Sequence, residues 1–243
     1  MTKFKNFYSP NFDQTKRRSS NIKYLIYHYT GMKSEISAIK RLCDIKSKVS
    51  CHYFIKKNGE ILQIIPDNYI SWHAGKSAWK KEKMLNKSSI GIEIHNSGHS
   101  FNYTHFNKNQ IISLKNLSNL LINKYRIKSY NVLGHSDISP DRKKDPGEKF
   151  PWQKLYTYKI GIWHSINSNS LKKMRNQKIP KNQYSTFTSF LKKIGYNFTA
   201  QKEKHSKFIF KAFQRHFRPQ VVNGKIDKEC LEIAKNLCKK GFY

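Results

Sequence analysis

Short apolar runs alternate with helix-like patterns along the first two thirds of the chain. Runs rich in β-branched and aromatic residues predict buried strands at 22–29, 89–95 and 131–134. A hairpin is predicted over 52–65, because the strong turn signal Asn58-Gly59 separates two apolar runs there.

Two segments between these strands have the spacing of amphipathic helices. In 34–45, Ser34 is a candidate N-cap, and the apolar face comprises Ile36, Ile39 and Leu42. In 107–125 the apolar side comprises Ile111, Leu114, Leu117, Leu120, Leu121 and Tyr125. Strands that alternate with helices predict an α/β domain over 22–165, with a central mixed β-sheet flanked by helices.

The two ends of the chain have different patterns. Residues 1–21 are predicted to be a polar N-terminal arm, and 166–181, rich in Ser, Asn and Lys, a linker. Residues 182–243 predict a small C-terminal module of three helices. Its helical patterns cover 186–194, 205–217 and 227–239.

The chain is strongly basic, with 47 Lys and Arg against 15 Asp and Glu and a formal net charge of +32. Such a charge favours polyanionic surroundings. Only 8 of the basic residues are Arg, the residue that suits phosphate and base recognition, so nucleic acid is not the expected partner. A general bias toward Lys, Asn, Ile and Tyr explains much of the charge equally well.

The cysteines and the apolar segments bear on disulfide formation, export and membrane insertion. The four cysteines form no CxxC pair, and Cys230 and Cys238, eight residues apart on a predicted helix, lie too far apart to bridge. The first 20 residues show no signal segment, and no stretch approaches a transmembrane span. As given, the chain is expected to be soluble, and the sequence predicts no oligomeric state.

The segment 135–152 concentrates candidate chemistry in a loop. Its prolines and Gly147 disfavour a long helix, and it contains His135 and Asp145, ten residues apart. Together with His28, which ends a predicted strand, they form a candidate set of two histidines and one carboxylate. Catalytic zinc uses three such protein ligands and keeps one position open for water.

Hydrolysis at such a metal also needs a base near the water and a cation near the developing oxyanion. Glu93 fits the first role, because a carboxylate on an otherwise apolar strand is unusual, and Lys143 fits the second. The structural alternatives remain open at this point. Glu93 can be a paired core carboxylate, and a histidine at the end of a strand can be a packed structural residue.

Four motifs follow one another in an order that is typical of a known family. They are IYHYT at 26–30, SWHAG at 71–75, SIGIEIHN at 89–96 and GHSDISPDRKKDPG at 134–147. The region from Ile22 to Trp163 therefore resembles zinc-dependent N-acetylmuramoyl-L-alanine amidases of the amidase-2 type, relatives of peptidoglycan recognition proteins. The resemblance is greatest to the AmiD-like branch, which carries a C-terminal helical peptidoglycan-binding module, and KAFQRHFRP at 211–219 is similar to that module.

The resemblance implies one catalytic Zn²⁺ held by His28, His135 and Asp145. It also implies Glu93 as the catalytic carboxylate and Lys143 as the group that stabilises the tetrahedral intermediate. The further residues that it implies line the substrate groove: Trp72, His73 and Ala74. Trp72 has an alternative role as a packing residue.

The sequence departs from phage-type relatives at Cys51, where they carry a catalytic tyrosine just before the histidine of this strand. The departure favours Glu93 as the base. His52 is expected to be structural, the role of His95 stays open, and Asp137 is expected, like Asp141, to make hydrogen bonds within its loop.

The activity that the resemblance implies is hydrolysis of the amide between N-acetylmuramic acid, including its 1,6-anhydro form, and L-Ala of the stem peptide. Peptidoglycan or muropeptides are then the expected partners, in cell-wall turnover or recycling. The alternative function is a recognition protein that binds peptidoglycan without cutting it. The family resemblance favours the cell envelope (periplasm) or secretion as the location, whereas the lack of a visible signal segment favours the cytoplasm.

Overall fold

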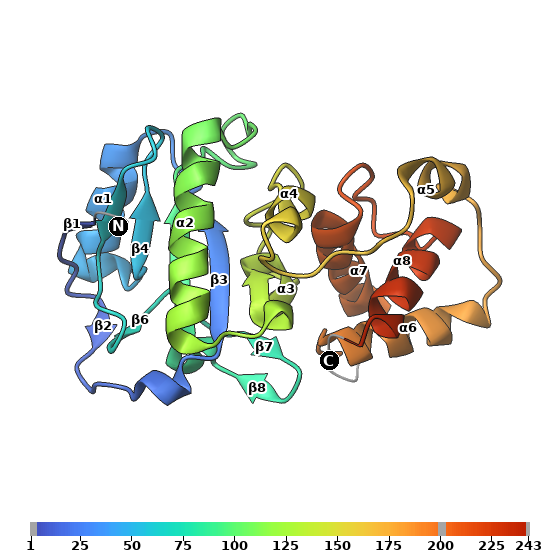
Figure 1. Ribbon diagram of the computed structural model, residues 1–243, viewed down its shortest axis with the longest axis horizontal. Helices are drawn as coiled ribbons and strands as arrows, with labels where there is room; N and C mark the ends of the chain where they lie inside the picture. The colour runs from blue at the N-terminus through green and yellow to red at the C-terminus, as the bar shows by residue number, and fades with distance from the viewer. Residues whose placement is uncertain (1–3, 199–202, 242–243) are drawn as a thin grey trace.

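The computed structural model describes residues 4–198 and 203–241, and it places a central sheet at one end and a group of helices at the other (Figure 1). The sheet has six strands in the order β1-β5-β4-β9-β3-β10. Strand β3 pairs in parallel with both β9 and β10, and β9 pairs in parallel with β4. The strands are β1 Lys5–Asn6, β3 Tyr24–Tyr29, β4 Tyr53–Ile55, β5 Ile61–Gln63, β9 Ser89–Ile94 and β10 Val132–Gly134.

This mixed sheet confirms the predicted fold class, because helices cover both of its faces. Helix α2 (Lys108–Tyr125) packs on the face that includes Tyr53 and Ile55, and helix α1 (Glu35–Cys43) packs on the face that includes Phe54. Adjacent residues of β4 serve opposite faces because side chains alternate along a strand. The turn at Gly59 joins β4 and β5 with a positive φ of 91°, as the predicted hairpin requires.

Side chains cap the first turns of both helices, and Ser34 does so as predicted. The Ser34 hydroxyl accepts a hydrogen bond from the Ser37 amide, and Asn107 forms a capping box with Gln110. The predicted apolar faces were partly wrong. Ile36 is 69% exposed and Leu120 is 36% exposed, so α1 packs through Ala38 and Leu42 instead of through Ile36.

The segment predicted as a polar arm over 1–21 contacts the rest of the domain along the residues that the structure describes. β1 pairs with β5, and β2 (Phe12–Asp13) pairs with β6 (Ile70–Ser71). Asn11 is buried and donates hydrogen bonds to three backbone carbonyls, while the Arg17 guanidinium donates to the carbonyls of residues 67, 86 and 89. Polar side chains thus bind the backbone of the domain, a role that hydrophobic periodicity does not reveal. Residues 1–3 lie outside the described part.

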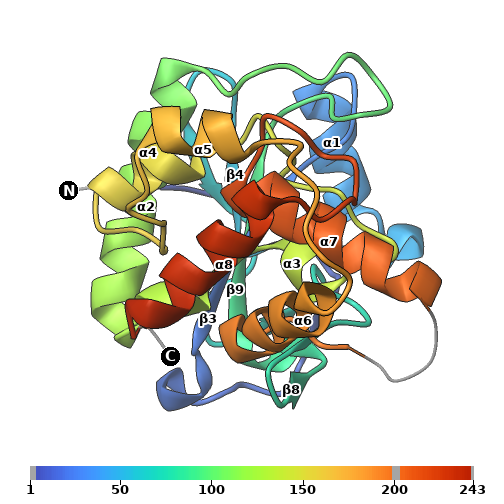
Figure 2. The ribbon, with the colours of Figure 1, turned by 90° about the vertical axis from the view of Figure 1, so that its right-hand side faces the viewer.

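The expected linker 166–181 contains helix α5 (Ser168–Met174), whose Leu171 is buried, so this segment is not a simple connection. The three predicted C-terminal helices are present. They are α6 (Gln183–Ile194), α7 (Glu203–Phe217) and α8 (Lys228–Lys239), and α8 packs against α6 and α5. Figure 2 shows these helices in front of the sheet strands, with α3 between them and the sheet. Residues 199–202 and 242–243 of the expected module lie outside the described part.

Short elements complete the fold between the sheet and the C-terminal helices. Helix α3 (His135–Ile138) begins directly after β10, and α4 (Trp152–Thr157) follows the loop. The hairpin β7 (Ala78–Trp79) and β8 (Glu82–Lys83) lies near α3. The 3-10 helices are Ser19–Asn21, Ile45–Ser47, Leu85–Ser88 and Ser129–Asn131.

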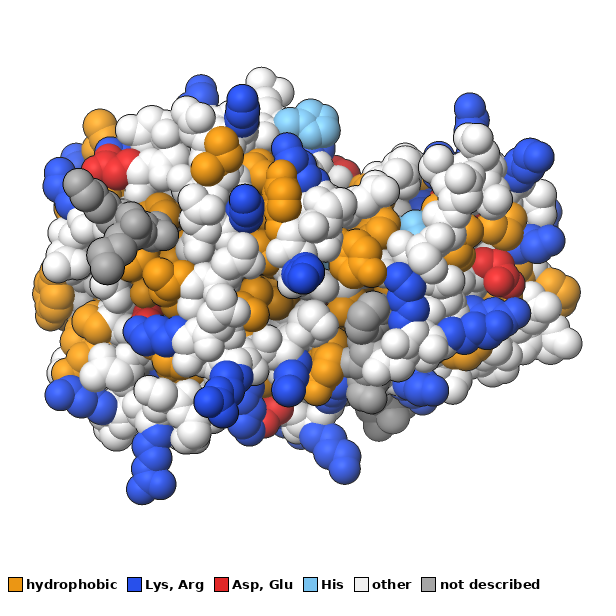
Figure 3. Space-filling view, in the orientation of Figure 1, with side chains coloured by type: hydrophobic (Ala, Val, Ile, Leu, Met, Phe, Trp, Pro, Cys, Tyr) orange, Lys and Arg blue, Asp and Glu red, His pale blue; other side chains and the backbone are white. Residues whose placement is uncertain are grey.

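Lysine and arginine side chains are spread over both ends of the face in Figure 3. Among the described residues, no helix is long and apolar enough to cross a membrane. The four cysteines are free thiols, in agreement with the predicted separation of Cys230 and Cys238.

Replacement of Leu114 by Ala should lower the free energy of unfolding by about 2–5 kcal/mol, because the fully buried side chain leaves a cavity between α2 and the sheet. The matched control is Ile112→Ala in the same helix. Ile112 is 46% exposed, so its loss should cost less than about 0.5 kcal/mol. Urea denaturation monitored by circular dichroism measures both values, and equal losses would contradict the burial of this helix face.

Candidate active site

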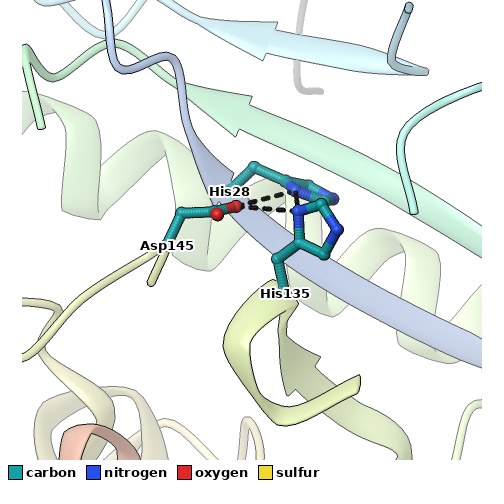
Figure 4. A group of neighbouring side chains, drawn as sticks. All are labelled: His28, His135 and Asp145. Atoms are coloured by element: carbon teal, nitrogen blue, oxygen red, sulfur yellow. Dashed lines mark hydrogen bonds and ion pairs between the residues drawn. The ribbon is translucent and has the colours of Figure 1, made fainter. Parts of the chain in front are cut away.

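Three buried side chains converge at the edge of the sheet: His28, His135 and Asp145 (Figure 4). Nδ1 of His28 lies 2.9 Å from Nδ1 of His135, and Oδ2 of Asp145 lies 3.0 Å from each of these nitrogens. The three donor atoms therefore form a nearly equilateral triangle.

Parallel pairing brings the two histidines together. Gly134, the last residue of β10, is paired with Tyr27 of β3. His135 and His28 are the next residues along the chain from this pair, so they lie side by side. Asp145 then returns to this edge, because its carbonyl accepts a hydrogen bond from the Ser136 amide at 2.8 Å. Gly134 permits this return, since a Cβ there would lie 2.6 Å from Cδ of Pro146.

Hydrogen bonds on the far side of His28 determine which of its nitrogens carries the proton. The Ser89 hydroxyl donates to the Leu85 carbonyl at 2.6 Å, so it accepts from Nε2 of His73 at 3.1 Å. Nδ1 of His73 is then an acceptor, and Nε2–H of His28 donates to it at 3.0 Å. This leaves the Nδ1 lone pair of His28 facing the other two donor atoms.

The same logic applies to His135, whose Nε2–H donates to the Ala74 carbonyl at 3.2 Å. Its Nδ1 lone pair thus also faces the centre of the triangle. Three lone pairs at 2.9–3.0 Å, with no hydrogen between the two nitrogens, repel one another unless a cation lies among them.

The donor set fits zinc. Zn–N and Zn–O bonds of about 2.0–2.1 Å place neighbouring tetrahedral donors about 3.3 Å apart, close to the distances observed here. The protonation states are also suitable, because zinc binds neutral imidazole and ionised carboxylate. Burial and His135 lower the pKa of His28 to about 4, so this imidazole is neutral at pH 7.

Glu93 lies beside this triangle, because β9 pairs it with His28 of β3. Its Oε2 is buried without a hydrogen-bond partner among the described residues. Burial, helped by Asp145 and opposed by Lys143, raises the pKa of Glu93 to about 8. A carboxyl group with a raised pKa and an unpaired buried oxygen is typical of an acid–base residue.

These residues open onto a cavity of about 760 Å³ between α1 and the loop 135–152. Its walls include Glu93, His135, Lys143 and Asp145. Cationic residues also line it: Lys33, Arg41, Arg142, Lys143 and Lys144. The aromatic residues of its wall are Tyr29, Trp72 and Phe101.

Two of the three residues expected to line the groove, Trp72 and His73, lie in the cavity wall. Trp72 does lie in the cavity wall, where its Nε1–H donates to Asp13 at 2.7 Å. His73 is largely buried behind His28. Its imidazole fits there because residue 91 is glycine, since a Cβ at Gly91 would lie 2.4 Å from the imidazole ring of His73. Ala74 is buried and acts through its carbonyl. Both therefore support the candidate ligands, and His73 also reaches the cavity wall.

The nearby residues that the sequence left open differ in their surroundings. His52 is buried and binds Arg17 and Ser71, which agrees with a structural role. Cys51 is a buried thiol whose pKa is raised by burial and by Glu93. His95 is half-buried and contacts the Thr30 hydroxyl at 3.4 Å.

Sequence patterns did not reveal a second group, in which the Tyr29 hydroxyl contacts Nδ1 of His99 at 2.9 Å. Nε2 of His99 is 3.1 Å from the Glu148 carboxylate, so this histidine is held in the cavity wall. The signal for Tyr29 was its position directly after His28. His99 lies in a polar loop and gave no such signal.

In zinc-free protein, we expect a pH-dependent stability difference between the wild type and Glu93→Gln. The carboxyl has an ordinary pKa of 4.5 when unfolded and about 8 when folded. Between these values the folded state keeps a proton that the unfolded state releases, so wild-type stability should fall by up to about 1.4 kcal/mol per pH unit. The stabilisation that the raised pKa of Glu93 gives the folded state is complete below pH 4.5 and lost above pH 8.

The glutamine variant lacks this titration, so its stability relative to the wild type should rise across that range and then level off. Urea denaturation from pH 4 to pH 9 in the presence of a chelator measures the difference. A constant difference would show that Glu93 has an ordinary pKa.

Known proteins are similar to this chain in sequence and in fold. The amidase-2 family model, described as N-acetylmuramoyl-L-alanine amidase, matches residues 18–148. The N-acetylmuramoyl-L-alanine amidase AmiD of Escherichia coli is 34% identical over 240 residues, which cover 93% of this chain and 86% of AmiD. The 1,6-anhydro-N-acetylmuramyl-L-alanine amidase AmpD of Haemophilus influenzae is 31% identical and aligns with 63% of this chain and 91% of its own length.

Solved structures agree with these sequence matches. E. coli AmiD in complex with anhydro-N-acetylmuramic acid-L-Ala-D-γ-Glu-L-Lys superposes with a TM-score of 0.81 over 95% of this chain and 93% of that chain, at 34% identity. AmpDh3 of Pseudomonas aeruginosa superposes with a TM-score of 0.80 over 96% and 97%, at 28% identity. Sequence and structure together show that the chain belongs to the amidase-2 family of N-acetylmuramoyl-L-alanine amidases.

Proposed function

We propose that this protein hydrolyses the amide between N-acetylmuramic acid and L-Ala of peptidoglycan stem peptides, with Zn²⁺ held by His28, His135 and Asp145. The observation that supports this most strongly is the triangle of three lone pairs, which opens onto the same cavity as Glu93 and Lys143. The AmiD and AmpD relatives are named as amidases of this kind.

Zinc bound to these residues would activate a water molecule and polarise the amide carbonyl. The side chains of the protein supply the proton transfers and the remaining charge stabilisation. The Glu93 carboxylate accepts a proton from the attacking water and returns it to the leaving amine. The Lys143 ammonium, in the same cavity wall, stabilises the oxyanion. The positive charge of zinc held by these ligands would favour the ionised form of Glu93, which is the form that can act as a base.

The charge of the cavity suits a stem peptide. Such peptides carry free carboxylates, and five Lys and Arg side chains line the cavity. The 1,6-anhydro form of the sugar is included in the proposal, because AmiD has been solved with an anhydro-N-acetylmuramic acid peptide. We place the protein in the cell envelope or outside the cell, where peptidoglycan lies, with the cytoplasm as the alternative.

The alternative function, peptidoglycan recognition without hydrolysis, would require no catalytic centre. All three candidate ligands are present here, together with Glu93 and Lys143, which favours hydrolysis.

A second cavity, of about 850 Å³, lies on the C-terminal helices, and we propose that it binds peptidoglycan. Tyr184 of α6 is 44% exposed in its wall, close to Phe210 of α7. Lysines also line this cavity: Lys178, Lys207 and Lys225. Aromatic faces suit sugar rings, and lysines suit the carboxylates of lactyl and peptide groups.

Replacement of Glu93 by Gln should lower hydrolysis of muropeptides by at least about 100-fold, because the isosteric amide cannot accept the proton. Zinc content, measured by atomic emission, should remain one per chain. Mass spectrometry of the digested muropeptides measures the product.

Glu82→Gln, at a surface carboxylate paired with Lys23, is the control and should keep full activity. Chelation should abolish the activity of the wild type, and added Zn²⁺ should restore it. Activity that survives complete removal of metal would refute the proposed role of zinc, and full activity of Glu93→Gln would refute its role as the base.

Tyr184→Ala should lower the affinity for insoluble sacculi about three- to tenfold, because an aromatic contact is lost. Co-sedimentation with the sacculi measures this affinity. Tyr8→Ala is the control, since Tyr8 is 67% exposed on the N-terminal part of the chain. Equal binding by both variants and the wild type would contradict a role for this cavity in binding.

A further inference from the structure

Two neighbouring residues of helix α7 reach the loop that carries two of the three candidate ligands. Nδ1–H of His216 donates to Oδ2 of Asp137 at 2.7 Å, and the Arg215 guanidinium lies 3.9 Å from the Glu148 carboxylate. Asp137 lies two residues after His135, and Glu148 lies three residues after Asp145. The contacts therefore enclose both ligand positions of the loop.

Asp137 is the central residue of this interface. Its Oδ2 also accepts the Gly134 amide at 2.8 Å, which caps the turn on which His135 begins α3. Its Oδ1 accepts the hydroxyl of Tyr196, the second residue after α6, at 2.7 Å. One buried carboxylate thus joins the backbone just before His135 to two side chains of the C-terminal module.

Because these residues are buried, the loss of one hydrogen-bond partner would leave a polar atom without a replacement. Asp137 is 1% exposed and His216 is 2% exposed, so water cannot replace a lost partner. The imidazole of His216 also stacks on the indole of Trp152, with ring centroids 3.8 Å apart and planes 15° apart. Its position is therefore fixed by packing as well as by the hydrogen bond.

We propose that the C-terminal helices form a structural part of the metal site, with His216 and Tyr196 as positioning residues that orient His135 through Asp137. The sequence-based expectation for Asp137, a hydrogen bond within its own loop, covers only its bond to Gly134. Loss of the His216 contact leaves Asp137 short of a partner and frees the turn that presents His135. Supporting residues behind metal ligands typically change affinity or activity 10- to 100-fold when mutated.

The test measures zinc affinity of the full chain by competition with a chromogenic chelator at a fixed pH. His216→Leu should bind zinc about 10- to 100-fold more weakly than the wild type. His216→Asn should recover most of the affinity, because the carboxamide can place an N–H donor near the position of Nδ1. Tyr196→Phe, which removes a single oxygen atom, should give a smaller loss.

Leu237→Ala is the matched control for general destabilisation of the module. Leu237 is fully buried on α8, so its truncation should lower the melting temperature. Its zinc affinity should stay near the wild-type value. Wild-type affinity in His216→Leu, or an equal loss in Leu237→Ala, would overturn the inference. If His216→Leu does not fold, Tyr196→Phe is judged by the same comparison.

The inference rests on the proposed zinc site, but the two fail in different ways. A wild-type protein that binds no zinc refutes the proposed function. A wild-type protein that binds zinc with an affinity independent of His216 and Tyr196 refutes only the positioning role.

Discussion

Parallel pairing of three strands is the constraint on which the site depends. Because β10, β3 and β9 run in the same direction, their carboxyl ends meet at one edge of the sheet. His28 and Glu93 are direct partners in this register, and His135 begins where β10 ends. A shift of one residue in either pairing would turn a candidate ligand or the candidate base toward the opposite face of the sheet. The apolar runs that hold the register therefore also set the geometry of the chemistry.

Around this edge, a layer of hydrogen bonds fixes protons as well as positions. The Ser89 hydroxyl and the Ala74 carbonyl each determine the tautomer of one histidine, directly or through His73. The ligand set is thus prepared for a cation before any cation binds. The three donor atoms therefore repel one another when no cation is bound. The packed sheet on one side and the loop 135–152 on the other keep them from moving apart.

The sequence predicted the features that rest on local or periodic patterns. The strands, the hairpin at Gly59 and the cap at Ser34 follow from side-chain periodicity and turn chemistry. The structure brings together His28, His135 and Asp145, which the family motifs had grouped, and it pairs Glu93 with His28. The errors concern contacts between distant segments. Asn11 and Arg17 are polar, so their burial against distant backbone groups could not be seen in a hydrophobic pattern. His73 and Asp137 have roles that depend on partners 45 and 79 residues away, His28 and His216.

The order of His216 and the candidate ligands along the chain has a consequence for biosynthesis. Translation delivers His28 first and the loop 135–152 next, and the helix that contacts Asp137 emerges later still. A ribosome-bound chain can therefore contain every candidate ligand while it lacks the contacts that enclose them. In that order, the proposed contacts around the metal site form only after α7 has emerged, which would delay the activity of a partly synthesised chain.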